Sequence, residues 1–526
     1  MADSTLRRPN AAFVFEVSDL EQGLDIDHQY DRSVGVPRPD RPILLRVDAA
    51  DRFDGVIVIG MPSRDAVAPG HIVSNGVHYP GRRVGGHWEV VLPGMDDGTI
   101  FHYIVAARDR AGSRRFADGD LDLEDATVFT HRVTTRRPPD WTRGTVVYQV
   151  FIDRFANSHG PVPVPANPNG WAGGDLNGVA AALPYLSDLG VNALWLTPVF
   201  ACHSYHGYDT TDFGRVDDRF GGNAAFAALV EAADRLGIRV ILDFVPNHVS
   251  DRHRWFQTAV AGGETRDWFS FADDGSYATF FGARGMPKVN LTNPDAAGAM
   301  VDAAMYWLDE FGVAGYRIDH VLGPEESFFA GLAAALNARH PEAWLFGEAT
   351  ASAAYCRRYG GLLDGATDFM LAYAFRDLMV GALMVDGFIE IEQEAAAVLP
   401  HEDFSWVRFF DNHDMSRARH LWDGNAEDVA RAAAMLFRLP GVPSLFYGTE
   451  QGLTHAASQE FGGLAVGRIP MRFDDPVGLV TPIRDLIRAR AAATISDPPA
   501  PVHWLRDGTS ATWTWNGFSG SVSAPG

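Results

Sequence analysis

The sequence predicts an α/β protein whose main part is a closed (β/α)8 TIM barrel. From about residue 145 to residue 492, short apolar segments alternate with longer segments whose apolar residues recur at helical spacing, which is the pattern of stacked βα units. Four of the short segments end in acidic or imidazole side chains, as catalytic groups do at the carboxyl rim of a parallel barrel. A β-sandwich is expected before the barrel and a short β-element behind it.

The N-terminal domain, residues 1–138, is predicted to be the β-sandwich, and it is a candidate for carbohydrate binding or dimerisation. Short runs of alternating hydrophobicity, separated by Gly, Pro and Asp turns, lie at 43–47, 55–59, 87–92 and 99–106. The segment 134–144, TTRRPPDWTRG, is the expected linker because its two prolines restrict the backbone.

The barrel is expected over residues 139–492, where eight segments have the composition of strands. These segments are 146–151, 193–196, 240–244, 315–318, 344–346, 367–370, 406–410 and 444–447. Segments 224–236, 296–311 and 426–439 are predicted helices between them.

Two further units are predicted around the barrel. The interval 249–295 follows the third strand, is too long for an ordinary βα loop and is rich in aromatic residues, so we expect an inserted subdomain B. After a last helix near 478–492, residues 493–526 form the C-terminal β-element, in which the run 509–523 predicts two or three strands.

Charge and composition exclude several classes of partner. The formal net charge of -23 argues against nucleic acid and against an anionic membrane surface, since both require basic patches. No window reaches the roughly 20 apolar residues of a membrane span, and no signal peptide is recognisable, so a cytoplasmic location is expected. The two cysteines, Cys202 and Cys356, are too few for a disulfide framework and are expected to be buried thiols.

The four strand-end motifs carry the chemistry. They are DFVPNH (243–248), GYRIDH (315–320), LFGEAT (345–350) and FFDNHD (409–414). Carboxylates that converge on one site suggest the cleavage of glycosidic bonds, for which retaining enzymes hold a nucleophile and an acid/base about 5 to 5.5 Å apart.

Asp319 and Glu348 are the candidates for this carboxyl pair. Arg317 lies two residues before Asp319 on an extended strand, so both side chains share one face and the guanidinium can keep the carboxylate ionised. Glu348 follows Leu345 and Phe346, an apolar approach that favours its protonated form.

These motifs resemble the α-amylase superfamily, glycoside hydrolase family 13, over roughly residues 145–475. Further matching segments are HGYDTTDF (206–213), VVYQVFIDRFAN (146–157), GGDLNGV (173–179), GVNALWLTPVF (190–200) and GVPSLFYGTE (441–450). The resemblance implies that Asp319 is the nucleophile, Glu348 the acid/base and Asp414 the transition-state stabiliser. Its implied substrate-binding residues are Tyr208, His248, Arg317 and His413, with Asp243 as structural support and His206 and Lys288 as further contacts.

Within this family, the chain most resembles the cyclomaltodextrinase, neopullulanase and maltogenic amylase group. The features that carry this likeness are the β-rich N-terminal domain, the PDW lead-in at 139–141, the short aromatic insert and the MPKVN segment around Lys288, the single lysine of the chain. The likeness implies a retaining hydrolase of small, cyclic or branched malto-oligosaccharides that forms a covalent β-glucosyl intermediate. It also implies a homodimer and no required cofactor.

The chain departs from this group at several places. Asp319 is followed by His320, Val321, Leu322, Gly323 and Pro324, where the group places polar residues toward the leaving sugar. The calcium loop of the group is replaced, which leaves Asn157, Gly173 and Asp175 as a partial oxygen cage for calcium. The C-terminal element is also shorter than the usual sandwich.

Two other functions remain open at the level of sequence. A transglycosylase or glucosyl isomerase, similar to a trehalose synthase, would use the same intermediate, and the apolar stretch after His320 favours it. A non-catalytic glucan-binding protein is the distant alternative, which the presence of all three carboxylates disfavours.

Overall fold

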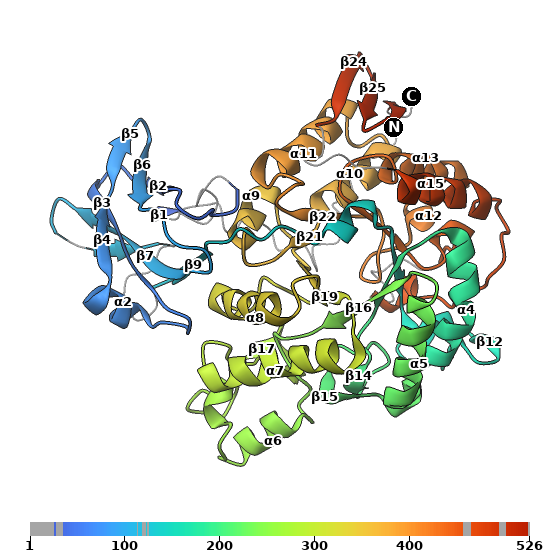
Figure 1. Cartoon of the computed structure of the whole chain (residues 1–526), viewed down its shortest axis with the longest axis horizontal. Helices are drawn as coiled ribbons and strands as arrows, with labels where there is room; N and C mark the ends of the chain where they lie inside the picture. Colours follow the sequence, from blue (N-terminus) through green and yellow to red (C-terminus); the bar gives the residue numbers. More distant parts are fainter. Residues whose placement is uncertain are drawn as a thin grey trace, which may run out of the picture.

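The computed structural model describes residues 26–27, 35–112, 114–117, 123, 126–455, 464–493 and 501–523. Figure 1 shows a β-rich N-terminal unit on one side of a larger α/β body, with a small sheet at the edge of that body. This arrangement follows the order of units that the sequence predicts.

Two antiparallel sheets make up the N-terminal unit, with strand orders β1-β2-β6-β5 and β4-β3-β7-β8, and β9 also pairs with β7. Apolar side chains from both sheets, among them Val47, Trp88, Val58 and Val105, form one core, which confirms the predicted sandwich. The elements are β1 (Ile26–Asp27), β2 (Ile43–Ala49), β3 (Phe53–Pro62), α2 (Pro69–Asn75), β4 (Val77–Pro80), β5 (Arg82–Val84), β6 (His87–Leu92), β7 (Ile100–Asp109), β8 (Arg114–Phe116) and β9 (Phe129–Arg132).

Eight parallel strands close into the predicted barrel in the order of the chain. Each pairs in parallel with its neighbours, and the last strand pairs with the first. The strands are β10 (Val147–Val150), β13 (Ala193–Leu196), β16 (Arg239–Phe244), β19 (Gly315–Ile318), β20 (Trp344–Gly347), β21 (Gly365–Thr367), β22 (Ser405–Arg408) and β23 (Val442–Phe446).

Helices connect the barrel strands and cover them, and α5, α7 and α13 lie where the sequence predicts helices. Within the described ranges, none of the helices is both long and apolar enough to cross a membrane. The helices are α3 (Ile152–Phe155), α4 (Leu176–Leu189), α5 (Gly222–Asp234), α7 (Pro294–Phe311), α8 (Glu326–Arg339), α9 (Ala353–Cys356), α10 (Phe369–Met379), α11 (Val385–Val398), α12 (Ala418–Leu421), α13 (Ala426–Leu436) and α15 (Val480–Ala492).

The predicted position of the sixth strand, 367–370, is wrong. Strand β21 ends at Thr367, and Phe369 already begins α10. The carboxylate of Asp368 accepts the backbone N–H of Leu371 at 3.0 Å, and this N-cap starts the helix where the sequence suggests continued strand. The seventh and eighth strands, predicted at 406–410 and 444–447, each begin earlier than expected, at Ser405 and Val442.

A small aromatic subdomain follows β16, as the sequence predicts. Phe256 packs against Phe269 and Tyr277, with ring centroids 5.1 and 4.7 Å apart, so the aromatic residues of this insert form a core of their own. Its elements are α6 (Arg254–Val260), η3 (Arg266–Trp268), β17 (Thr279–Phe280) and β18 (Ala283–Pro287). Short hairpins β11 (Ala156–Asn157) with β12 (Gly160–Pro161), and β14 (Phe200–Cys202) with β15 (Thr210–Val216), extend the loops after β10 and β13.

The C-terminal element is a three-stranded antiparallel sheet of β24 (His503–Asp507), β25 (Ser510–Trp515) and β26 (Phe518–Ser523). It packs against the helices near the end of the barrel, where Trp504 contacts Phe388 of α11 and Arg431 of α13 donates to the carbonyl of Ser523 (Figure 1).

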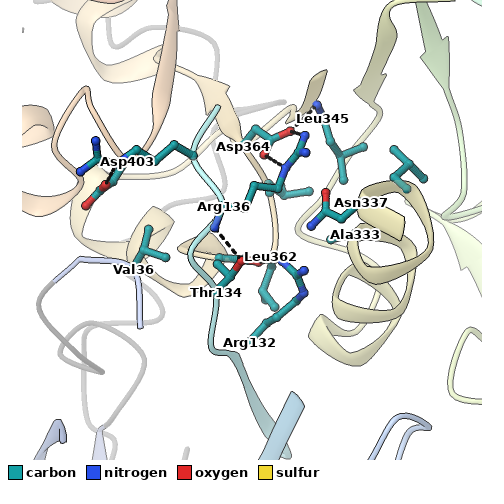
Figure 2. Close-up of a pocket in the computed structure, with 14 residues that line it drawn as sticks. Val36, Arg132, Thr134, Arg136, Ala333, Asn337, Leu345, Leu362, Asp364 and Asp403 are labelled. Atoms are coloured by element: carbon teal, nitrogen blue, oxygen red, sulfur yellow. Dashed lines mark hydrogen bonds and ion pairs between the residues drawn. The ribbon is translucent and has the colours of Figure 1, made fainter. Parts of the chain in front are cut away.

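Arg136 and Arg132 hold the linker and the N-terminal unit on the barrel (Figure 2). The Arg136 guanidinium donates through Nε and Nη2 to the two carboxylate oxygens of Asp364, each at 2.8 Å. One of these oxygens also accepts the backbone N–H of Leu345 at 3.0 Å. Arg132, at the end of β9, donates to the carbonyl of Gly361 at 3.2 Å, so strand and linker are both fixed to the barrel.

Candidate active site

The four strand-end motifs place their acidic side chains at the carboxyl rim of the barrel. Asp243 lies at the end of β16, Asp319 directly follows β19, Glu348 directly follows β20, and Asp414 lies in the loop after β22. Because the strands are parallel, these ends meet at one rim. The structure therefore brings together all four acids that the sequence identifies.

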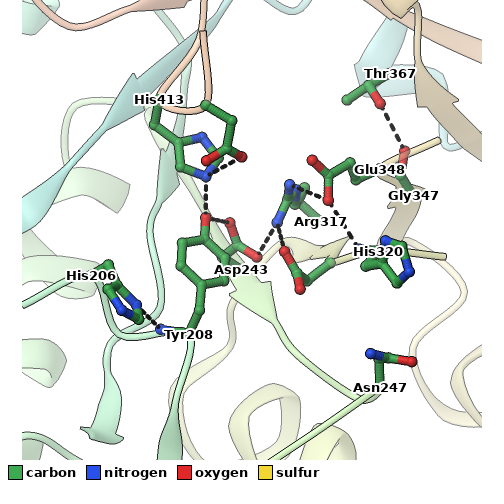
Figure 3. Close-up of polar contacts among 12 residues, drawn as sticks. His206, Tyr208, Asp243, Asn247, Arg317, His320, Gly347, Glu348, Thr367 and His413 are labelled. Carbon is green, nitrogen blue, oxygen red and sulfur yellow. Dashed lines mark hydrogen bonds and ion pairs between the residues drawn. The ribbon is translucent and has the colours of Figure 1, made fainter. Parts of the chain in front are cut away.

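Arg317 of β19 connects three of these carboxylates (Figure 3). Its Nη1 donates to Asp243 and to Asp319, each at 2.7 Å, and its Nη2 lies 3.0 Å from the carboxylate of Glu348. The Arg317 side chain is only 1 % exposed, so these charge-assisted contacts are shielded from water. The sequence spacing predicts the contact with Asp319, whereas the contact with Glu348 emerges only from the fold.

Asp243 is fully buried and is bound by two further donors besides Arg317. The indole N–H of Trp195 donates to it at 3.0 Å and the hydroxyl of Tyr208 at 2.9 Å. Asp243 therefore fixes Arg317 and Tyr208 relative to each other.

Burial raises the pKa values of the two candidate reacting groups. It raises the pKa of Asp319 to about 6, against the opposing effect of Arg317, and it raises the pKa of Glu348 above its ordinary value. Because desolvation outweighs the ion pair with Arg317, Asp319 is ionised at neutral pH but becomes protonated as the pH falls below about 6. The expectation that Arg317 keeps Asp319 ionised therefore holds only near neutral pH and above. The expectation that an apolar approach favours protonated Glu348 agrees with the direction of its shift.

A second polar group, centred on His413, faces the first across the site. The side-chain amide of Gln149 donates to His413 Nδ1 at 2.7 Å, which leaves Nε2 as the N–H. This Nε2 lies 3.0 Å from Asp414 and 2.5 Å from the Tyr208 oxygen. The rings of Tyr208 and His413 also stack, with centroids 5.4 Å apart and an interplanar angle of 9°.

Arg468 completes this second group. Its Nη2 donates to Asp414 at 2.9 Å and its Nε to the carbonyl of His413 at 2.9 Å. Burial alone would raise the pKa of Asp414, but His413, Arg468 and Arg317 together hold it below its ordinary value. Asp414 is therefore the most readily ionised carboxyl of the site.

His248 and His206 contact the backbone of Tyr208 as uncharged imidazoles. The His248 Nε2 donates to the Tyr208 carbonyl at 3.1 Å, and its ring stacks on Phe280 with centroids 4.4 Å apart. His206 Nδ1 accepts the backbone N–H of Tyr208 at 3.1 Å. Burial lowers the pKa of His248 to about 3 and that of His206 to about 4, so both imidazoles are uncharged at neutral pH.

The polar groups line a cleft of about 270 Å³. Apolar side chains line it together with the polar groups: subdomain B contributes Phe280, Phe281 and Met286, and the loop after β19 contributes Leu322. His320 adopts a left-handed backbone conformation, with φ 43°, and its ring lies 5.0 Å from Phe280. The cleft is further lined by His206, Tyr208, His248, Asp319, Glu348, Thr350, Phe369, Tyr373, Asp414, Met415 and Arg468.

Among the residues that the structure describes, Lys288 is not one of those that line the cleft. Its backbone pairs with that of His248, and its ammonium donates to the Gly323 carbonyl at 3.4 Å. The contact supports the loop after Asp319 from outside the cleft.

The residues predicted for calcium binding make local hydrogen bonds. The Asn157 amide donates to the Gly173 carbonyl at 3.3 Å, while its oxygen accepts the backbone N–H of His159. The carboxylate of Asp175 caps α4 by accepting the backbone N–H of Gly178 at 2.7 Å. Across the described ranges, no group of three or more His, Cys, Asp or Glu side chains is arranged to hold a metal ion.

Sequence reasoning missed several residues of the site. Arg468 follows no strand motif, and nothing in its local sequence distinguishes it from other arginines of the chain. Gln149 and Trp195 lie within strand segments that were identified only as parts of the barrel, although a buried glutamine on an inward-facing position is itself a signal.

Comparisons with known proteins agree with this geometry. The model of the alpha amylase catalytic domain matches residues 149–465. The chain is 36% identical to alpha-amylase 2 of Dictyoglomus thermophilum and 33% identical to the intracellular maltogenic amylase of Bacillus subtilis, over 60% and 62% of its length. These matches span 56% and 58% of the relatives' own lengths.

A solved structure is similar as well. The cyclic alpha-maltosyl-(1→6)-maltose hydrolase from Arthrobacter globiformis, in complex with cyclic alpha-maltosyl-(1→6)-maltose, superposes with a TM-score of 0.65 at 27% identity, covering 72% of this chain and 89% of that one. The fold and the rim of carboxylates define a barrel protein of the glycoside hydrolase type. The chain belongs to the alpha-amylase family, and the resemblance stated from its motifs, including that to maltogenic amylases, is confirmed.

Proposed function

We propose that the protein is a retaining hydrolase of small, cyclic or branched malto-oligosaccharides. The observation that carries the proposal is the contact of one buried guanidinium, Arg317, with both Asp319 and Glu348 at the cleft. A double displacement at an anomeric carbon requires an ionised nucleophile and a protonated acid, and Arg317 holds the two candidate groups at one site.

In the first step, a carboxylate oxygen of Asp319 attacks the anomeric carbon while Glu348 gives its proton to the departing glycosidic oxygen. The raised pKa of Glu348 keeps this proton available near neutral pH. A β-glucosyl ester on Asp319 and a free sugar hydroxyl result. In the second step, Glu348 takes a proton from water, the hydroxide oxygen bonds to the anomeric carbon, and Asp319 leaves as the carboxylate.

Asp414 is proposed to stabilise the transition state. The oxocarbenium-like sugar carries positive charge, and an ionised carboxylate at the cleft favours it electrostatically. His413 and Arg468 fix both oxygens of Asp414, so its position costs little reorganisation during the reaction. Tyr208 and His248 line the same cleft and are the proposed contacts to the reacting ring.

The substrate class rests on the shape of the cleft and on the relatives. The cleft volume of about 270 Å³ lies near the lower end of ligand sites, which suits a short segment of glucan. The phenyl rings of Phe280 and Phe281 offer apolar faces to sugar rings. The similar hydrolase from Arthrobacter globiformis forms a complex with cyclic alpha-maltosyl-(1→6)-maltose. A homodimer and, from the name of the Bacillus subtilis relative, an intracellular location are part of the same proposal.

Transglycosylation is the second candidate, and one observation favours it. Leu322, Met286 and Phe281 line the same cleft as Glu348, and apolar side chains there can help an acceptor sugar to exclude water from the glucosyl intermediate.

A product analysis tests both candidates. Purified protein is incubated with maltotriose, pullulan, three cyclodextrins, cyclic branched tetrasaccharides, sucrose and trehalose, and the products are resolved by chromatography and by NMR of their anomeric protons. We expect ring opening or panose and maltose release, with the α-anomer formed first. Larger or isomerised sugars without net hydrolysis support the second candidate, and initial β-anomers contradict the role of Asp319 as a nucleophile.

A further inference from the structure

A second polar cavity lies at the opposite end of the barrel from the carboxylates. Ser405 begins β22 and Val442 begins β23, and both line this cavity, so it lies at the amino rim. Its volume is about 30 Å³. Thr142 of the linker and Trp515 of the C-terminal sheet complete its wall, so three parts of the chain meet there.

The nitrogens around this cavity lack the hydrogen bonds that buried groups usually make. Arg490 Nε and both ring nitrogens of His401 are buried without a partner, and both residues line the cavity. The neighbouring Arg408 has a further unpartnered nitrogen, Nη2. Three buried nitrogens of the lining residues thus have unmet hydrogen-bonding capacity, which points to an occupant that accepts hydrogen bonds.

The charges around the cavity favour an anion over water. Arg408 is paired with Asp368 and Glu392, at 3.3 and 3.1 Å. Arg490 is 1 % exposed, and among the described residues it forms no ion pair; its two terminal nitrogens bind backbone carbonyls.

The environment of Arg490 therefore leaves its charge uncompensated. The ring of Trp515 lies 4.7 Å from its guanidinium carbon, which excludes water on that side. Glu402 also lines the cavity, and within the described ranges no ion pair joins it to Arg490. Burial and the nearby Arg408 lower the pKa of Arg490 to about 9, which reflects the same lack of a counter-ion.

We propose that this cavity binds one small monovalent anion of chloride size, held by Arg490 Nε and His401, and that the anion stabilises the junction of the barrel base, the linker and the C-terminal sheet. A cavity needs about 10 to 15 Å³ to hold one water, so about 30 Å³ admits a monatomic anion and excludes phosphate and organic carboxylates. The position is remote from the carboxylate cleft, so the site is independent of the proposed catalytic mechanism.

Anomalous diffraction from crystals of the full chain soaked in sodium bromide tests occupancy. We expect a bromide peak in the cavity within hydrogen-bond distance of Arg490 Nε. Density that contains only water in the cavity overturns the proposal.

Thermal unfolding tests the structural role of the anion. At equal ionic strength and pH, sodium chloride is expected to raise the unfolding midpoint by about 2 °C over sodium gluconate, whose anion is too large for the cavity. The Arg490→Met variant is expected to lose this difference, as is His401→Leu, which serves if Arg490→Met fails to fold. The control Arg488→Met lies on the same helix, where its side chain binds Asp188 at the surface, and should retain the difference. A chloride effect that both cavity variants retain contradicts the role assigned to this site.

Discussion

At the scale of single residues, the site depends on how one arginine is shared. Arg317 contacts Asp243, Asp319 and Glu348, so one positive charge faces three carboxyl groups. Because burial raises the pKa of each of them, at least one proton is readily retained within this group, and Glu348 is the group whose proton the proposed reaction uses.

Replacing Glu348 tests its role as the acid. In Glu348→Gln, the amide retains the shape but has no proton to give to the leaving oxygen, so we expect kcat on maltotriose to fall by about 10²- to 10⁴-fold. The loss should be much smaller for the first step with α-glucosyl fluoride, whose leaving group needs little protonation. Both rates are measured by product release, with circular dichroism to verify folding. Equal losses on the two substrates contradict the assignment.

Replacing Asp319 tests the energetic cost of the site. The pKa of Asp319 is about 6 in the folded protein, against about 3.9 in an unfolded chain. Between pH 4 and 6 the folded state therefore holds a proton that the unfolded state has released, so this group makes stability fall as pH rises, by roughly 2 to 3 kcal/mol. In Asp319→Asn this loss is absent.

The expected result is that Asp319→Asn is inactive yet more stable than the wild type at pH 7, with little difference at pH 4. Urea unfolding at the two pH values measures this. Asp273→Asn, at an exposed position of subdomain B, is the control and should show no pH-dependent gain. A variant that is less stable than the wild type at pH 7 contradicts the effect of burial on Asp319.

At the scale of elements, the packing of β19 against β20 determines where the two candidate reacting carboxyls lie. Gly315 begins β19 with φ 143°, and a Cβ there would lie 2.0 Å from the carbonyl oxygen of Trp344, the first residue of β20. The backbone of Trp344 cannot move aside without breaking the pairing of β19 with β20, so this position requires glycine.

A pair of glycine substitutions tests this packing. Gly315→Ala is expected to lower the free energy of unfolding by about 3 kcal/mol or more, or to prevent folding. Gly298→Ala lies within α7 in open space and is expected to raise stability by about 0.5 to 1 kcal/mol, because alanine favours helix. Chemical denaturation measures both, and comparable effects of the two variants contradict the argument.

The sequence predicts the elements better than it predicts their ends. Strands of continuous apolar residues, such as Ala193–Leu196 and Gly315–Ile318, are placed correctly because burial on both faces leaves a clear pattern. The sixth strand is misplaced because Asp368 caps a helix whose apolar residues also suit a strand. Local composition cannot show which of these two structures the packing selects.

The candidate site shows the same limit. Asp319, Glu348 and Asp414 can be identified because they interrupt apolar strand motifs, and the structure brings them to one rim. Arg468 cannot be found this way, since its contact with Asp414 joins residues 54 positions apart through tertiary folding.

At the scale of the whole molecule, an ion pair of low exposure joins the linker behind the N-terminal sandwich to the barrel. Arg136 binds both oxygens of Asp364, and their side chains are 14 and 8 % exposed. Burial disfavours the charged form of Arg136 and would lower its pKa. The hydrogen bonds to Asp364 outweigh this effect, so the pKa of Arg136 is raised. The two charges thus depend on each other for compensation.

Removing one partner is therefore expected to cost more than removing both. Arg136→Met leaves the Asp364 carboxylate buried and uncompensated, and we expect a loss of about 3 to 5 kcal/mol, with the sandwich melting before the barrel in calorimetry. The double variant Arg136→Met with Asp364→Leu should recover part of this loss, because no buried charge remains. Arg137→Met, whose guanidinium meets Asp403 at a half-exposed position, is the control and should cost under about 1 kcal/mol. If the double variant is as unstable as the sum of the two single changes, the pair acts independently and the barrel and sandwich are held together by other contacts.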